Sequence, residues 1–201
     1  MSNIKNYKKN VSNKKSYTSR KNAKSYDRPI KNVVREKIIE LIRLKKIKSI
    51  LTLETHEYLF SKQLPDKKIF VFEFDRKEHR KMEKHKPENV KLFFGDVSSC
   101  SDIDNNFECI YLDFCYGFDN SIGVINQLKN KIIQSKIFAV TFCLRNYYPE
   151  EGDYQFEIQR KLVDVIGCPL KPLYGYTYRD NHNKSAVMIT MLFEVYKGVV
   201  E

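Results

Sequence analysis

Short apolar runs alternate with amphipathic segments along most of the chain. The apolar runs predict strands and are bounded by polar residues, at 49–53, 68–74, 90–94, 107–112 and 136–144. After Pro29 and over 120–134, apolar residues recur at helical spacing, which predicts helices there. Asp75 as a cap and Pro87 as a stop predict a helix over 76–84, and Gly167 and Pro169 end a further helix over 154–166. Two longer runs, 173–178 and 185–196, flank a polar turn and predict a closing β-hairpin.

This order of elements limits the fold class. Strands that alternate with helices imply a mostly parallel sheet with helices on both faces. The nearly continuous apolar strands suit burial on both sides, and the final hairpin adds at least one antiparallel strand. The sequence therefore predicts an α/β fold with a seven-stranded sheet.

Charge divides the chain into two parts. Residues 1–28 hold nine Lys and Arg against Asp27 alone, whereas the remaining residues hold 27 basic and 24 acidic side chains. The first segment has almost no aliphatic residues, so we expect a disordered basic tail over 1–28 and an α/β domain over 29–201. Its interspersed tyrosines favour nucleic acid as partner; a solubilising or targeting arm is the alternative.

Composition excludes several other classes of protein. The five cysteines are odd in number and lack a CxxC pair, and the four histidines lack ligand spacing, so neither a disulfide framework nor a metal site is expected. No apolar run approaches the ~20 residues of a membrane span, and the N-terminus is unlike a signal peptide. We expect an intracellular protein, cytoplasmic or nuclear, or in the host cell if viral.

The stretch 112–118 carries the most suggestive chemistry. Asp113 stands at the C-terminal end of an apolar run that predicts a strand, and we expect a loop rich in aromatic residues to follow it. In open α/β sheets ligands bind outside the carboxyl ends of the strands, where a carboxylate and aromatic faces can hold a planar polar group. Alternatively, Asp113 caps the next turn and the aromatic residues complete the core.

The order of elements, together with acids at the strand ends, resembles the class I S-adenosylmethionine-dependent methyltransferases, whose fold is Rossmann-like. The resemblance implies S-adenosylmethionine as cofactor. It assigns Glu73, in Val-Phe-Glu-Phe-Asp, to the ribose hydroxyls, with Asp75 as an alternative. It assigns Asp96, in Gly-Asp after the third strand, to the adenine amino group.

The resemblance also implies a substrate site after the fourth strand. Amino-methylating enzymes of nucleic acids carry Asp/Asn-Pro-Pro-Tyr/Phe there, and this chain keeps the first and last members as Asp113 and Tyr116. These two are the predicted catalytic residues, for orienting an amine and holding a base. Phe114, Arg145 and Tyr147 are the predicted substrate-binding residues.

The first motif departs from the family. Where glycines normally follow the first strand, residues 54–60 contain none, and Glu54 or Thr55 is left to bind the amino group of the cofactor. Alternatively the pocket is closed and the protein is a non-catalytic relative. Tyr174, Tyr176 and Tyr178 alternate along the first hairpin strand, a pattern that usually reports sheet packing.

Three functions follow as hypotheses. The first is a methyltransferase acting on DNA or RNA, with nucleic acid held by the basic tail and the strand-end face. The second is an inactive methyltransferase-like module that binds nucleic acid or assembles with a protein partner. The third is a methyltransferase for a protein or a small molecule.

Overall fold

The computed structural model describes residues 29–144, 153–179 and 187–196, without the side chains of Cys115 and Tyr116. Its helices are α1 (Pro29–Leu44), α2 (Arg76–His85), α3 (Phe118–Gln134) and α4 (Tyr154–Ile166), with short 3₁₀ helices η1 (Ser61–Gln63) and η2 (Val97–Asp102). Its strands are β1 (Ser49–Thr52), β2 (Lys68–Glu73), β3 (Val90–Phe94), β4 (Cys109–Gly117), β5 (Ile137–Cys143), β6 (Leu170–Arg179) and β7 (Val187–Val195).

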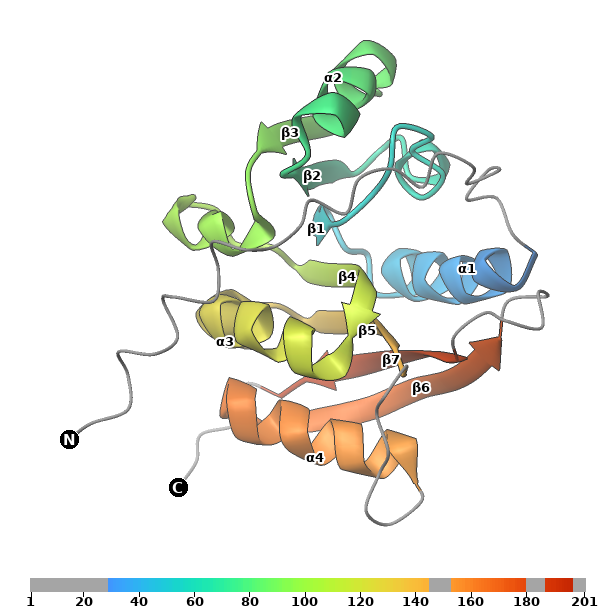
Figure 1. The fold of residues 1–201 in the computed structure, drawn as a ribbon, viewed down its shortest axis with the longest axis vertical. Helices are drawn as coiled ribbons and strands as arrows, with labels where there is room; N and C mark the ends of the chain where they lie inside the picture. The colour runs from blue at the N-terminus through green and yellow to red at the C-terminus, as the bar shows by residue number, and fades with distance from the viewer. Residues whose placement is uncertain (1–28, 145–152, 180–186, 197–201) are drawn as a thin grey trace.

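The strands form one seven-stranded sheet in the order β3-β2-β1-β4-β5-β7-β6 (Figure 1). The first five strands in this order run parallel to one another, and β7 runs antiparallel between β5 and β6. The predicted α/β class, the mostly parallel sheet and the closing antiparallel hairpin are confirmed. The strand order reverses between β1 and β4, which is where ligands bind in sheets of this kind.

Two hydrophobic clusters cover the two faces of the sheet. One contains the buried faces of α3 and α4 together with η2. The other contains α1, the segment after β1, and Met82 of α2. Every residue of β5 is buried, as expected for a strand covered on both sides. Helices therefore lie on both faces, as the sequence predicts.

Local sequence signals fix several helix ends. Asp75 caps α2 by accepting from the backbone N–H groups of Lys77 at 2.8 Å and Glu78 at 2.9 Å. Asp153 caps α4 in the same way. Gly167 ends α4 with φ of 77°, a left-handed conformation that glycine adopts without strain.

The region after β4 differs from the prediction. Residues 113–117 are not a loop, because β4 continues to Gly117 and α3 begins at once with Phe118. A register shift between Asp113 and Gly117 marks a bulge against β5. Asp113 therefore lies within the strand, paired with Thr141, and not after its last residue.

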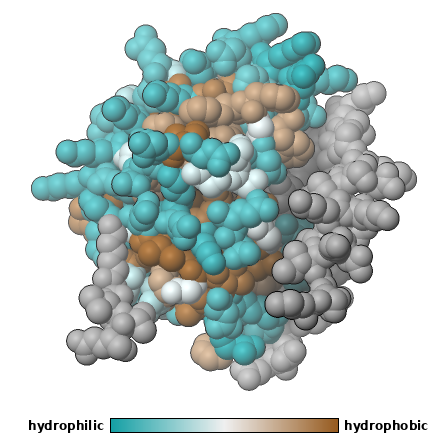
Figure 2. Space-filling view, turned by 90° about the vertical axis from the view of Figure 1, so that its left-hand side faces the viewer, coloured by the Kyte–Doolittle hydropathy of each residue, from teal (hydrophilic) through white to brown (hydrophobic). Residues whose placement is uncertain are grey.

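Residues 1–28 lie outside the described part of the chain, so the prediction of a disordered tail stays a prediction. None of the described helices is long and apolar enough to cross a membrane. The cysteines 100, 109, 143 and 168 are buried free thiols. In the view of Figure 2, long hydrophilic side chains surround smaller apolar areas on the surface.

Two leucines test how stability divides between core and surface. Leu128 of α3 is 0% exposed, whereas Leu44 at the end of α1 is 75% exposed. We expect Leu128→Ala to lower the free energy of unfolding by about 2–5 kcal/mol, because it removes buried methyl groups and leaves a cavity. Leu44→Ala should change it by less than about 0.5 kcal/mol. Urea denaturation of both variants makes the comparison; equal losses would contradict this assignment of the core.

Candidate functional site

Three neighbouring strands each have a carboxylate at a corresponding position, on the strand in β2 and β4 and two residues after its end in β1. Thr52 of β1 pairs with Val71 of β2 on one side and with Tyr111 of β4 on the other. Two residues beyond each member of this row stand Glu54, Glu73 and Asp113. The parallel register therefore brings three acids to one edge of the sheet, on both sides of the point where the strand order reverses.

Glu54 is occupied by its own loop. Its Oε1 accepts from the backbone N–H groups of Phe60 at 3.0 Å and Ser61 at 2.9 Å, and its Oε2 accepts from the Ser61 hydroxyl at 2.6 Å. Burial raises the pKa of Glu54 to about 7, against the opposing effect of these hydrogen bonds. Glu54 thus holds the start of η1 in place. The sequence predicted a contact with the cofactor for this residue and did not predict this structural role.

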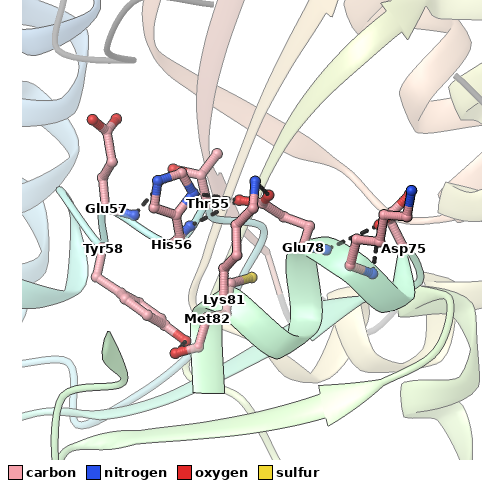
Figure 3. Close-up of polar contacts among 9 residues, drawn as sticks. Thr55, His56, Glu57, Tyr58, Asp75, Glu78, Lys81 and Met82 are labelled. Atoms are coloured by element: carbon pink, nitrogen blue, oxygen red, sulfur yellow. Dashed lines mark hydrogen bonds and ion pairs between the residues drawn. The ribbon is translucent and has the colours of Figure 1, made fainter. Parts of the chain in front are cut away.

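The glycine-free loop takes its shape from bulky residues. Tyr58 is fully buried, has φ of 50°, and donates its hydroxyl to the Met82 carbonyl oxygen at 3.2 Å (Figure 3). A positive φ is uncommon for a large side chain and is found at sites where the surrounding structure imposes it. Tyr58 therefore takes a backbone conformation that glycine adopts more readily.

A second contact ties this loop to α2. His56 Nδ1 lies 2.5 Å from Glu78 Oε1, and the His56 backbone N–H donates to the same oxygen at 3.3 Å (Figure 3). Thr55 precedes His56 and is partly buried, and its carbonyl oxygen accepts from the Tyr58 N–H at 3.1 Å. The loop after β1 is thus fastened at Glu54, His56 and Tyr58, with Thr55 between two of these points.

Glu73 and Asp75 have separate local roles at the end of β2. Glu73 Oε1 accepts from the Asp75 backbone N–H at 2.6 Å, and partial burial raises the pKa of Glu73. Asp75 is occupied as the cap of α2. Of the two predicted candidates for the ribose hydroxyls, Glu73 has the carboxylate with fewer contacts inside the described structure.

Two exposed aromatic rings lie beside these acids, and sequence reasoning did not single them out. Phe74 follows Glu73 and is 60% exposed; Phe94, which pairs with Glu73 across the sheet, is 54% exposed. Arg76 lies over the Phe94 ring at 5.6 Å, and His79 meets its edge. The only sequence signal for them was an aromatic residue within two residues of an acid at the end of each strand, which does not distinguish an exposed ring from a buried one.

Asp96 follows Phe94 and Gly95 at the end of β3. It is exposed, and its Oδ1 accepts from the Ser98 backbone N–H at 2.9 Å, which begins η2. Gly95 has φ of 149°, and it donates its N–H to the Glu73 carbonyl oxygen at 3.0 Å. The register therefore places Asp96 near the end of the strand beside Glu73, with its second carboxylate oxygen directed at no described donor.

Asp113 is the least satisfied of the acids. Its Oδ2 lies 3.4 Å from Lys31 Nζ of α1. Its Oδ1 is buried, and no donor among the described residues reaches it. A buried acceptor without a hydrogen bond costs about 1–3 kcal/mol, and a role in binding or catalysis is one of the reasons for which native structures retain one.

Polar side chains surround Asp113 on the α1 face of the sheet. Thr141 and Thr190 share a hydrogen bond of 2.8 Å between their hydroxyls. Burial raises the pKa of Tyr178 to about 12, with Asp113 adding to this effect. Burial also raises the pKa of Tyr111, and Asp113 acts in the same direction. Both phenols therefore stay protonated, and hydrogen-bond donors, near Asp113.

The remaining predicted site residues fall in different places. Phe114 is 1% exposed and packs against Phe142 in the core, because its side chain points to the face opposite Asp113. The prediction that Phe114 contacts substrate does not fit this burial. Tyr116 belongs to β4, but its side chain is not described. Arg145 and Tyr147 lie outside the described residues.

Comparison with known proteins gives a result for the fold alone. No protein-family model matches this chain, and no curated protein matches it in sequence. Among solved structures, the N-methyltransferase NodS from Bradyrhizobium japonicum WM9 superimposes with a TM-score of 0.60 at 10% identity, over 85% of this chain and 99% of NodS. NodS has also been solved with S-adenosyl-L-homocysteine.

Two further structures give similar agreement. A putative O-methyltransferase from Klebsiella pneumoniae has a TM-score of 0.57 at 14% identity, over 81% of this chain and 80% of that one. Trm5b from Pyrococcus abyssi has a TM-score of 0.56 at 16% identity, over 81% of this chain and 48% of Trm5b. The predicted resemblance to the class I methyltransferases is thus confirmed at the level of the fold.

The Glu54 carboxylate should make stability depend on pH. Its pKa is raised from the usual 4.5 to about 7 in the folded protein, so its stabilising contribution is complete below pH 4.5 and is lost as pH rises through 7. Relative to Glu54→Gln, we expect the wild-type free energy of unfolding to fall by about 3 kcal/mol from pH 4.5 to 8. Urea denaturation of both proteins across this range measures it. A difference that stays constant with pH would show that Glu54 is not held in this buried setting.

Proposed function

We propose that this protein is an S-adenosylmethionine-dependent methyltransferase that acts on nucleic acid. The observation that carries the proposal is the row of acids Glu54, Glu73 and Asp113 at the reversal point of a methyltransferase-type sheet, with Asp96 beside it. The net charge of +11 favours an anionic substrate. A Rossmann-like sheet alone hosts many functions, so the proposal depends on these side chains.

The residues at the ends of β2 and β3 fit the adenosine half of the cofactor. Glu73 can accept from two vicinal ribose hydroxyls in a charge-assisted contact. Phe74 and Phe94 offer exposed apolar rings for a purine, and Asp96 has a carboxylate oxygen for its amino group. Glu73 and Phe94 are paired on adjacent strands, and Phe74 and Asp96 follow them within two residues, so Phe74 and Asp96 stand close along the chain to this pair.

The residues after β1 fit the methionine half less well. Glu54 already accepts three hydrogen bonds from its own loop, which leaves Thr55 and the backbone beside it as the nearest polar groups. Because burial raises the pKa of Glu54 to about 7, much of this side chain is protonated at neutral pH, so it offers little charge to a cationic cofactor. We therefore retain Thr55 as a contact and reassign Glu54 to positioning the loop.

Asp113 is the residue best placed for the chemistry. When bound, the cofactor supplies a methyl group on a positively charged sulfur. Methylation of an amine needs an acceptor that orients the nitrogen lone pair and receives a hydrogen bond from its N–H. The unpaired Oδ1 of Asp113 can take this role, while Oδ2 lies 3.4 Å from Lys31 Nζ.

A second candidate function is a binding module without activity. The observation in its favour is the loop of residues 54–61, which is fastened by Glu54, His56 and Tyr58 and contains no glycine. Such a loop limits how closely a ligand can approach the backbone after β1. On this hypothesis the fold would serve nucleic-acid binding or assembly with a partner. The third hypothesis, a protein or small-molecule substrate, has no comparable support among the described residues.

Calorimetric titration separates an active enzyme from an inactive module. We expect S-adenosylmethionine and S-adenosylhomocysteine to bind the wild-type protein, and Glu73→Ala and Asp96→Ala to weaken binding by about tenfold or more, since each loses a charge-assisted hydrogen bond. Asp102→Ala is the matched control, because Asp102 is an exposed acid at the far end of η2. Absence of binding at millimolar cofactor, by a folded sample, would leave the module hypothesis.

Transfer of a labelled methyl group to RNA and DNA tests the role of Asp113. We expect Asp113→Ala to lower the rate constant of methyl transfer by about 10²-fold or more, because the lost carboxylate is the hydrogen-bond acceptor for the target amine. Cofactor affinity should stay near the wild-type value. Asp113→Asn should retain part of the activity, since an amide oxygen still accepts a hydrogen bond. Equal loss of cofactor affinity and of rate would assign Asp113 to cofactor binding instead.

A further inference from the structure

A row of tyrosines lies on the same face of the sheet as Asp113. Tyr174, Tyr176 and Tyr178 alternate along β6, with ring centroids 6.2 Å apart for the first pair and 5.9 Å for the second. Tyr178 is buried, and Tyr174 and Tyr176 stay partly exposed. β6 is the edge strand of the sheet. The row therefore runs along this edge strand, and Tyr178 at its C-terminal end is within electrostatic range of Asp113.

Basic residues of α1 accompany this row along its length. Tyr178 lies within electrostatic range of Lys31, Arg35 and Asp113, and Tyr174 lies within range of Lys37. Tyr174 and Tyr176 also pack against the hydrophobic cluster to which α1 contributes. The helix and the strand thus form one continuous surface, here called the α1–β6 surface and made of these three tyrosines with Lys31, Arg35 and Lys37.

The positive charge of α1 is only partly neutralised inside the protein. This helix holds four Lys and Arg (31, 35, 37 and 43) against two Glu, residues 36 and 40. Lys37 pairs with Glu40 at 2.9 Å on the surface, a contact that water and salt weaken readily. Arg35 donates to the neutral Asn32 side chain, so this hydrogen bond does not cancel its charge.

The other face of β6 is already in use. A Cβ added to Gly175 would lie 2.3 Å from Gln155 Oε1, which shows how closely α4 covers this side of the strand. The tyrosines occupy the opposite side. Packing against α4 thus accounts for residues on the far face, and the partly exposed Tyr174 and Tyr176 lie on the face that α4 does not cover.

We propose that the α1–β6 surface binds a single strand of nucleic acid and leads it to Asp113. Aromatic rings that accept bases by stacking, next to cations that follow the phosphates, are the combination by which proteins bind single strands without reading sequence. Tyrosine hydroxyls also donate to phosphate oxygens. The surface deepens the proposed function and rests on it for the identity of the substrate, but binding itself requires no cofactor.

Fluorescence anisotropy with the full chain and short RNA and DNA oligonucleotides tests the surface. We expect the variant Tyr174→Leu/Tyr176→Leu/Lys37→Gln to bind single strands about tenfold more weakly, as loss of a stacked base predicts. Lys37→Gln alone should reduce the dependence of log affinity on log salt by about 0.7. The control Tyr196→Leu/Lys129→Gln removes an exposed tyrosine and an exposed lysine elsewhere and should bind normally.

Cross-linking of the wild-type protein gives a test that needs no variant to fold. A photoreactive single strand should attach to the tryptic peptide 162–179, which contains all three tyrosines. Unchanged affinity of the triple variant, or cross-links confined to other peptides, would overturn the proposal. Duplexes that bind as tightly as single strands, with the same losses in the triple variant, would also overturn it, because the surface would then not select a single strand.

The outcomes also separate this surface from the proposed function. Methylation of nucleic acid by a wild-type protein whose triple variant binds normally would reject the surface and keep the function. Binding through the surface without methyl transfer would keep the surface and reject the enzyme. No binding of either nucleic acid would reject both the surface and a nucleic-acid substrate, while cofactor titration would still report on the methyltransferase site.

Discussion

The parallel pairing of β1 with β2 and β4 is the constraint on which the rest of the site depends. Because parallel strands point their carboxyl ends to the same edge, the register Thr52–Val71–Tyr111 fixes where the next residues of all three strands emerge. Glu54, Glu73 and Asp113 stand at corresponding positions for this reason. A shift of one residue in any strand would turn its acid to the opposite face.

A carboxylate and a buried phenol fasten the loop after β1, which contains no glycine. Glu54 gathers the N–H groups at the start of η1, and Tyr58 takes a left-handed backbone conformation that its hydrogen bond to Met82 helps to hold. The loop is consequently built from specific contacts and has less conformational freedom than a glycine-rich turn. Whether the protein is an enzyme depends chiefly on how much room this loop leaves.

The sequence was sufficient to predict the fold, because apolar runs and helical periodicity report burial directly. It was also sufficient to find the acids, since each stands at or near a strand end. Prediction from the sequence failed where contacts between distant segments determine the structure. The extension of β4 through Gly117 depends on pairing with β5, and the burial of Phe114 follows from that extension. The carboxylate of Glu54 accepts a hydrogen bond from Ser61, seven residues away, and no sequence motif predicts this contact.

The acidic residues of the candidate site and the basic residues of the chain are concentrated in different places. The acids Glu54, Glu73 and Asp113 lie together at the sheet edge, whereas α1 and the tail carry much of the positive charge. A cationic cofactor and an anionic polymer are attracted by opposite fields, so one protein can bind both only if these fields are kept apart. Lys31 stands where they meet, 3.4 Å from Asp113 and within range of Tyr178. On the proposed function, this lysine would neutralise part of the charge on Asp113 and so let a phosphate-bearing strand approach a carboxylate that otherwise repels it.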